Sequence, residues 1–317
     1  MTDEEFAFRI AEIGVRLRLG EPRSPLQLAI PETYGVFRCS NTGPHDVEVR
    51  ARVAPPPPIQ GRHVFTSGTL WQLYEHKRLC QIAFFVPRKA ALLPPGGAGR
   101  VRALRANREK MVMDRLAIFR SDFTKGELYL SPDVFATKRP KAAGIFPLSY
   151  PLDELLFINL LAQGRGVELH GCGVSMRGEG LLFIGPSGAG KSTIARLMAT
   201  RPGVTVLSDD RTILRRMKGR WRIYGTPWHG TARAFAAEGA ELKRIFVLRH
   251  SDSNQARRLS PARAAAILVA RSFPTYWNRA GMNYTLTLVE QVISDLPIYD
   301  LGFQPTISCV DFVQSIG

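Results

Sequence analysis

Apolar residues alternate with polar or charged residues in several segments of the first half of the chain. Such alternation places apolar side chains on one face of a β-strand. Strand-like runs occur within residues 15–19, 47–53, 63–87, 113–119 and 126–130. We therefore predict a β-rich region over residues 1–149. Within it we expect a short helix over residues 4–13 and a hairpin that pairs residues 35–38 with residues 47–53.

From residue 150 onward, segments with helical spacing of apolar residues alternate with short apolar runs. Residues 152–162 begin after Pro151 and carry two acidic residues in the first turn, as helices often do. The same reasoning predicts helices over residues 194–200, 261–269 and 282–294, and strands over residues 167–170, 181–184, 204–207, 298–303 and 307–312. This mixture predicts an α/β domain over residues 150–317.

The most specific local pattern is an apolar strand, a glycine-rich loop and a helix in direct succession. The loop fits G-x-x-x-x-G-K-[ST], and its predicted nucleotide-binding residues are Gly185, Pro186, Ser187, Gly188, Ala189, Gly190, Lys191, Ser192 and Thr193. Glycines let backbone N–H groups turn toward an anion, and the helix N-terminus adds partial positive charge. We predict a phosphate-binding P-loop, in which Lys191 would reach the outer phosphates and Ser192 would ligate Mg²⁺. The alternative is a turn that binds nothing.

A second pattern follows one helix later, where an apolar strand ends in Ser208, Asp209 and Asp210. A carboxylate beside a P-loop can hold Mg²⁺, and another can accept the proton of an attacking hydroxyl. Neighbouring residues on a strand point to opposite faces, so the two acids would have separate roles unless the strand has already turned. An ordinary turn with acidic caps is the alternative interpretation.

Charge and composition narrow the class of partner. The 317 residues carry a net charge of +16, divided between both halves of the chain, which favours anionic partners such as nucleotides or acidic substrates. A solvated basic surface would explain the same charge, and no recognition module for nucleic acid is visible, so we do not expect nucleic-acid binding. The arginines at 100, 102, 105 and 108 form either an exposed face or a dock for phosphate or acidic peptide.

The N-terminus and the length of the apolar runs indicate where in the cell the protein is located. No apolar run reaches about 18 residues, the length at which a membrane-spanning helix is considered. The acidic N-terminus does not have the pattern of a signal peptide. We therefore expect a cytoplasmic protein without a membrane partner.

These segments together resemble the catalytic domain of HPr kinase/phosphorylase. The resemblance rests on Leu169-His170-Gly171, on the loop at 185–192 and on Ser208-Asp209-Asp210-Arg211. The same core resembles the nucleotide lobe of phosphoenolpyruvate carboxykinases. Residues 224–230 and 242–248 look like segments of HPr-kinase-related proteins found with peptide-natural-product and PqqD-like systems. Over residues 150–310, the resemblance implies a P-loop kinase core that uses ATP and Mg²⁺.

The resemblance implies a role for each matching residue. The loop glycines and Lys191 would cradle the phosphates, Ser192 and Asp209 would bind Mg²⁺, and Asp210 would activate a serine-type hydroxyl. His170 would lie near the transferred phosphate, and Arg211 would either stabilise that group or pair with Asp209. Two departures argue against phosphorylase activity and against HPr as substrate: Thr193 stands where HPr kinases carry an acid, and residues 225–230 occupy the place of their Arg-Gly-x-Gly signature.

The resulting hypothesis is a kinase that transfers the γ-phosphoryl group of ATP to a serine or threonine hydroxyl of a peptide or protein. Its partners would be that substrate, a PqqD-like peptide-binding protein and, in an oligomer, further copies of the same chain. Two alternatives stay open. One is a kinase for a small hydroxy compound, and the other is a nucleotide-dependent scaffold or regulator that transfers nothing.

Overall fold

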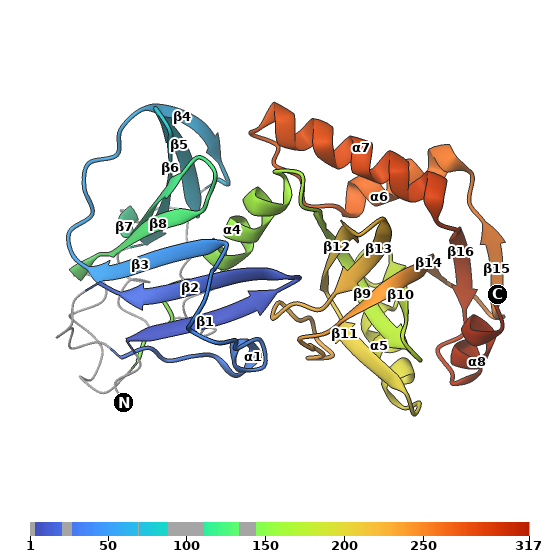
Figure 1. Ribbon diagram of the computed structural model, residues 1–317. Coiled ribbons are helices and arrows are strands. Elements are labelled where there is room, and N and C mark those ends of the chain that lie inside the picture. The colour runs from blue at the N-terminus through green and yellow to red at the C-terminus, as the bar shows by residue number, and fades with distance from the viewer. Residues whose placement is uncertain (1–3, 21–26, 69, 88–110, 133–143, 317) are drawn as a thin grey trace. The chain divides into compact units, whose positions relative to one another are not determined.

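A computed structural model describes residues 4–20, 27–68, 70–87, 111–132 and 144–316 of the chain (Figure 1). The chain forms two compact units. Unit 1 consists of Met1–Phe8, Ile13–Pro31 and Arg38–Tyr150, and unit 2 of Arg9–Glu12, Glu32–Phe37 and Pro151–Gly317. The two short segments of unit 2 that come from the N-terminal part of the chain have no counterpart in the sequence pattern.

The first half of the chain builds one eight-stranded sheet, in agreement with the predicted β-rich character. Its strands are β1 (Glu5–Ile10), β2 (Ile13–Leu19), β3 (Val47–Val53), β4 (Arg62–Thr66), β5 (Trp71–His76), β6 (Leu79–Pro87), β7 (Met111–Arg120) and β8 (Lys125–Leu130). They are ordered β1-β2-β3-β8-β7-β6-β5-β4. The strand β3 runs parallel to both β2 and β8, whereas the pairs from β8 to β4 are antiparallel.

Two expectations for this half are wrong. The helix expected over residues 4–13 is the strand β1, which turns into β2 through Ala11 and Glu12 with φ angles of 50° and 63°. Apolar residues at 6, 8, 10 and 13 fit both periodicities over so short a segment, and pairing with β2 decides for the strand. The expected hairpin is also absent from the described residues, because Glu32–Gly35 form the short helix α1 and β3 pairs with β2 and β8.

The second half mixes helices and strands, which confirms the predicted α/β character. The elements are α4 (Leu152–Leu161), β9 (Val167–Met176), β10 (Glu179–Ile184), α5 (Lys191–Ala199), β11 (Val204–Ser208), β12 (Arg211–Met217), β13 (Arg220–Tyr224), β14 (Gly239–His250), β15 (Gln255–Arg258), α6 (Pro261–Arg271), α7 (Arg279–Asp295), β16 (Ile298–Phe303) and α8 (Ser308–Ser315). The sheet follows the order β10-β9-β12-β13-β14-β16-β15, and β10 also pairs with β14. This extra pairing closes β10, β9, β12, β13 and β14 into a ring.

The segment near the C-terminus corrects another expectation. Residues 307–312 were expected as a strand, but residues 308–312 belong to α8 and Ile307 is the N-cap of this helix. Cys309, Val310 and Val313 are fully buried, and their spacing places them on one helical face. They pack in the same cluster as Ile194 and Met198 of α5. Contact with α5, rather than pairing with a strand, therefore determines the conformation of this segment.

Residues 181–184 of β10 are all apolar because both faces of this part of the strand are buried. Phe183 packs in one cluster with residues of α5 and α8, and its neighbour Leu182 packs in another with residues of α6 and α7. A strand covered on both faces loses the alternation of a half-exposed strand. The glycine-rich loop therefore begins at the end of a strand that is fixed on both sides.

Two further expectations concern features outside this architecture. The arginines at 100, 102, 105 and 108 lie outside the described residues. Among the residues that are described, no helix combines the length and the apolar character needed to cross a bilayer.

Candidate functional site

The glycine-rich loop joins the end of β10 to the start of α5. Gly188 and Gly190 have φ angles of +82° and +99°, a region that favours glycine. A Cβ atom at Gly190 would lie 2.5 Å from the ring of the buried Phe303, whereas one at Gly188 would meet nothing within 4 Å. The loop tip formed by Pro186, Ser187 and Gly188 is exposed. The sequence thus folds into a turn whose backbone has room for an outside group at its tip.

Lys191, the first residue of α5, is buried and folds back onto its own loop. Its Nζ atom donates hydrogen bonds to the carbonyl oxygens of Gly185, at 3.0 Å, and of Pro186, at 3.1 Å. Burial lowers the pKa of Lys191, an effect that the Asp210 carboxylate opposes and the charges of Arg271 and Arg211 reinforce. The ammonium group therefore lies within electrostatic range of the second acid of the Asp-Asp pair.

His250, at the end of β14, also fixes the loop. Its Nε2 atom is 2.8 Å from the carbonyl oxygen of Gly188. Since a carbonyl only accepts, Nε2 carries the proton in this contact. The ring stacks on Phe303 with centroids 6.0 Å apart. Sequence reasoning missed His250, because it lies 62 residues from Gly188 along the chain.

The two acids lie in the bend between β11 and β12, and they face different partners. The carboxylate of Asp209 is buried and accepts hydrogen bonds from the backbone N–H groups of Gly230 and Ala232, both at 2.8 Å, and of Ala234 at 3.3 Å. The Oδ2 atom also lies 3.5 Å from the Ser192 hydroxyl, which in turn accepts a bond from Thr231 at 3.0 Å. Asp209 thus holds residues 230–234 against the start of α5.

Asp210 is part of a group with His170 and Arg211. Arg211 Nη1 donates to Asp210 Oδ2 at 2.6 Å and lies 2.8 Å from His170 Nδ1, which is itself 3.2 Å from Asp210 Oδ1. Because arginine can only donate, Nδ1 either accepts from Arg211 or, when it carries a proton, donates to Asp210. His170 and Arg211 are partners in the β9–β12 register, which brings this group together.

The charges around Asp210 set its protonation. Partial burial would raise the pKa of the Asp210 carboxyl, but its hydrogen bond with His170 and the positive charges of Arg211 and Lys191 lower it below its usual value. Asp210 is consequently ionised at neutral pH. Its side chain retains 28% exposure, so a molecule from solvent can approach it.

Two buried glutamates lie behind Arg211, and sequence reasoning missed both. Arg211 Nε is 2.7 Å from Glu154 Oε1 and 3.4 Å from Glu168 Oε1. Burial, reinforced by the nearby Glu154, raises the pKa of Glu168 well above its usual range. The guanidinium also lies 4.4 Å from the ring centroid of Phe273. These contacts fix the position of Arg211. In the structure Arg211 pairs with Asp210, whereas a pairing with Asp209 was one of the two alternatives expected from the sequence.

The aromatic segment at 228–229 has a structural role within unit 2. Trp228 donates through Nε1 to Asp153 Oδ2 at 2.9 Å, and Tyr34 donates to the same oxygen at 2.5 Å. His229 stacks on Phe235 with ring centroids 5.6 Å apart. Both contacts anchor the segment that leads to residues 230–234. Thr193, the last of the predicted loop residues, lies half-buried in the first turn of α5.

The geometry brings together a glycine-rich turn, a lysine, a hydroxyl and two carboxylates. Ser192 and Asp209 supply hard oxygen ligands of the kind that Mg²⁺ prefers. No group of three or more His, Cys, Asp and Glu side chains suited to a metal occurs in the described part of the chain. This is compatible with Mg²⁺, which commonly takes one or two protein ligands and completes its shell with phosphate and water.

Comparisons with known proteins give two similarities. A protein-family model described as "SynChlorMet cassette protein ScmC" matches residues 155–288, less than half of the chain. This stretch contains His170, the glycine-rich loop and the two acids. Among solved structures, the Hpr(Ser) kinase/phosphatase from Coxiella burnetii is similar with 15% identity and a TM-score of 0.23, covering 39% of this chain and 88% of that chain. No curated protein matches.

Proposed function

We propose that this protein is an ATP-dependent kinase that transfers the γ-phosphoryl group to a serine or threonine hydroxyl of a peptide or protein. One observation carries the proposal. The loop with left-handed Gly188 and Gly190 precedes a helix whose Ser192 contacts Asp209, while Asp210 lies within electrostatic range of Lys191. A phosphate-binding turn, a metal-binding pair and an ionised carboxylate are the parts that phosphoryl transfer requires.

The nucleotide phosphates would lie at the exposed loop tip and the start of α5. There Lys191 would exchange its bonds to the carbonyls of Gly185 and Pro186 for phosphate oxygens. Ser192 and Asp209 would hold Mg²⁺, which when bound neutralises phosphate charge. The bonds that Asp209 accepts from residues 230–234 keep its carboxylate aimed at Ser192. A fixed carboxylate loses little entropy when the metal binds.

Asp210 would act on the acceptor. The hydroxyl oxygen forms a bond to the γ-phosphorus, the bond from that phosphorus to the bridging oxygen of ADP breaks, and the hydroxyl proton passes to Asp210. The lowered pKa keeps Asp210 ionised and ready to accept this proton. Arg211 and His170 would orient the carboxylate through the contacts at 2.6 and 3.2 Å.

A transfer assay with γ-labelled ATP, Mg²⁺ and peptides encoded beside the gene tests the proposal. We expect labelled peptide with the wild type and at least about a hundredfold slower transfer with Asp210→Asn, the size of effect usual for a positioned base. Asp252→Asn, an exposed aspartate of the same unit, is the matched control and should transfer at the wild-type rate. Unchanged transfer by Asp210→Asn would remove the assigned base.

The same assay separates the two alternatives. Nucleotide binding that orders a partner without any transfer would identify a scaffold or regulator. Label that enters a compound of a metabolite extract, and no peptide, would identify a kinase for small hydroxy compounds. A Lys191→Ala variant that binds ATP as tightly as the wild type would contradict the proposed kinase and both alternatives, because each of the three places phosphates at the loop.

A further inference from the structure

The outward face of the unit 1 sheet carries a dense pattern of charged side chains. The alternation in β3 buries Val47, Val49 and Ala51 and leaves Glu48 and Arg50 exposed. Strand register extends this face in rows. Arg16 of β2 is opposite Glu48, which is opposite Lys125 of β8, and the next row joins Arg18, Arg50 and Glu127. The charged rows therefore follow directly from the strand pattern.

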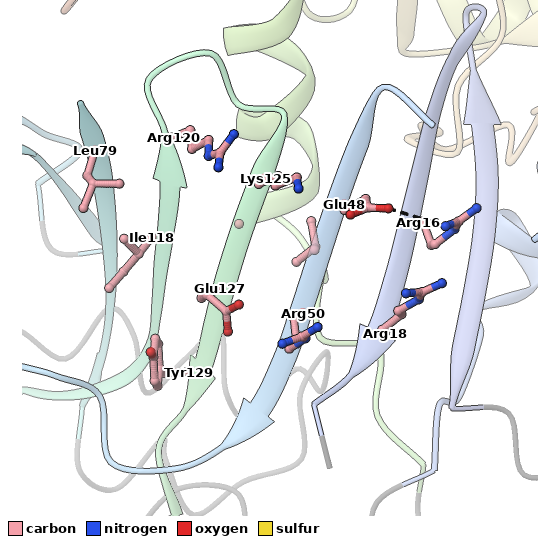
Figure 2. Close-up of a pocket in the computed structure, with 12 residues that line it drawn as sticks. Arg16, Arg18, Glu48, Arg50, Leu79, Ile118, Arg120, Lys125, Glu127 and Tyr129 are labelled. Atoms are coloured by element: carbon pink, nitrogen blue, oxygen red, sulfur yellow. Dashed lines mark hydrogen bonds and ion pairs between the residues drawn. The ribbon is translucent and has the colours of Figure 1, made fainter. Parts of the chain in front are cut away.

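This face is hollowed into a groove with a volume of about 460 Å³ (Figure 2). We call it the basic groove. Its charged lining residues are Arg16, Arg18, Arg50, Arg120, Lys125, Glu48 and Glu127. The lining is completed by Leu79, Ile118, Tyr129, Val49 and Gly126. The lining residues belong to β2, β3, β8, β7 and β6, which follow one another in the sheet (Figure 2). Five basic and two acidic residues line the groove, so its lining carries an excess of positive charge.

The two acids are already engaged by arginines. Glu48 pairs with Arg16 at 3.4 Å, and Glu127 pairs with Arg52 just outside the groove. Each acid also faces a second basic residue across the strands, Lys125 for Glu48 and Arg50 for Glu127. Glu48 therefore pairs with Arg16 and not with Lys125. Glu127 pairs with Arg52 and not with Arg50. Among the described residues, no carboxylate lies within ion-pair distance of Arg50, Lys125 or Arg120.

We propose that the basic groove binds an extended acidic segment of a peptide or protein. Side chains on one face of an extended peptide recur every two residues, or about 6.6 Å, which is also the spacing of the charged rows along the strands. Carboxylates at this spacing would supply ion-pair partners for Arg50, Lys125 and Arg120. The exposed Leu79 and half-buried Ile118 at the side offer contact to an apolar residue of the same segment.

The arrangement favours a peptide over a nucleic acid or a membrane. Glu48 and Glu127 interrupt the positive charge, so a continuous phosphate backbone would meet two like charges. Tyr129 is the aromatic residue of the lining, and Arg52 covers one face of its ring at 5.4 Å from the centroid, which reduces the surface open for stacking of bases. A hollow also suits a chain better than the flat surface of a bilayer.

Fluorescence anisotropy with the full-length protein tests this inference. The probe is a fluorescein-labelled peptide of about ten residues in which glutamate alternates with serine around one leucine, a length that spans the rows of the groove. The comparison peptides replace glutamate with glutamine or lysine. No nucleotide is added, so the result does not depend on the proposed phosphoryl transfer. The test variant is Arg50→Gln with Lys125→Gln, and the matched control is Arg62→Gln with Lys77→Gln, which removes two charges of unit 1 outside the groove.

We expect saturable binding of the glutamate peptide only, weakened about fivefold by the groove variant and unchanged in the control variant. Raising the salt concentration from about 0.1 M to about 1 M should also weaken binding. Equal loss in both variants would assign binding to net charge and overturn the inference, as would the lack of saturable binding. A single-stranded RNA oligonucleotide, or vesicles of anionic lipid, that bind more tightly than the peptide and respond only to the groove variant would overturn it in favour of that ligand. Circular dichroism of both variants verifies folding.

Discussion

Replacing Gly190 with alanine tests how the glycine-rich loop is built. Gly190 combines a φ angle of +99° with a close approach to the buried ring of Phe303. Gly188 is the matched control, because its φ angle of +82° carries the same backbone demand and its Cβ would meet nothing within 4 Å. The two alanine variants therefore differ in one respect, the contact with Phe303.

The expected losses of stability follow from two costs, the left-handed backbone conformation and the contact with Phe303. An alanine forced into the left-handed region costs about 1–2 kcal/mol, which both variants share. An extra methyl group in a packed core adds about 1–3 kcal/mol. Phe303 is fully buried and packs with residues of α5 and α8, so it has no free direction in which to move. We expect Gly190→Ala to lower the free energy of unfolding by roughly 2–5 kcal/mol and Gly188→Ala by roughly 1–2 kcal/mol.

Urea denaturation followed by circular dichroism measures both free energies without any ligand. The double variant Gly190→Ala with Phe303→Leu gives a further readout, since a smaller side chain makes room for the methyl group and the two changes should cost less together than the sum of each alone. Equal destabilisation of the two single variants, or strict additivity in the double variant, would refute the reasoning that Phe303 excludes a side chain at 190.

The remaining predictions concern buried carboxyl groups, and urea denaturation checks each of them. Asp209→Asn should lower the free energy of unfolding by about 2–4 kcal/mol, because an amide cannot accept on both sides the backbone N–H bonds that the carboxylate accepts; a cost no larger than that of the exposed Asp252→Asn would contradict this. Burial raises the pKa of Glu168 above its usual value of 4.5, so the folded state holds this proton more tightly than the unfolded chain, and Glu168→Gln should gain stability relative to the wild type as the pH rises above 4.5; a difference in stability that does not vary with pH would contradict this. Burial raises the pKa of Asp153 from 3.8 to about 6. The folded state therefore holds this proton more tightly than the unfolded chain, and the wild type loses up to about 3 kcal/mol of stability from this group as the pH rises from 4 through 6. Asp153→Asn should lack that loss, so its stability relative to the wild type should rise over this interval; a difference that does not vary with pH would contradict the assignment.

The sequence by itself determined the parts that depend on local spacing. The strand, loop and helix around residues 181–199 follow from an apolar run, glycines and helical periodicity within about twenty consecutive residues. The helices α4, α6 and α7 and the alternating strands of unit 1 were predicted in the same way. Local periodicity failed where a segment was short. Residues 4–13 and 307–312 fit helix and strand alike, and their neighbours in space decided between the two.

Only the tertiary structure decided which distant side chains meet at the candidate site. Arg211 contacts His170 because β12 pairs with β9 in one register, and Asp209 reaches Gly230 because the chain returns to it 21 residues later. Glu154 and Glu168 read as ordinary acids of a helix and a strand until Arg211 is placed between them. A sequence pattern records the periodicity of one element, whereas register and packing relate different elements, so the partners of each charge emerge only when the chain is folded.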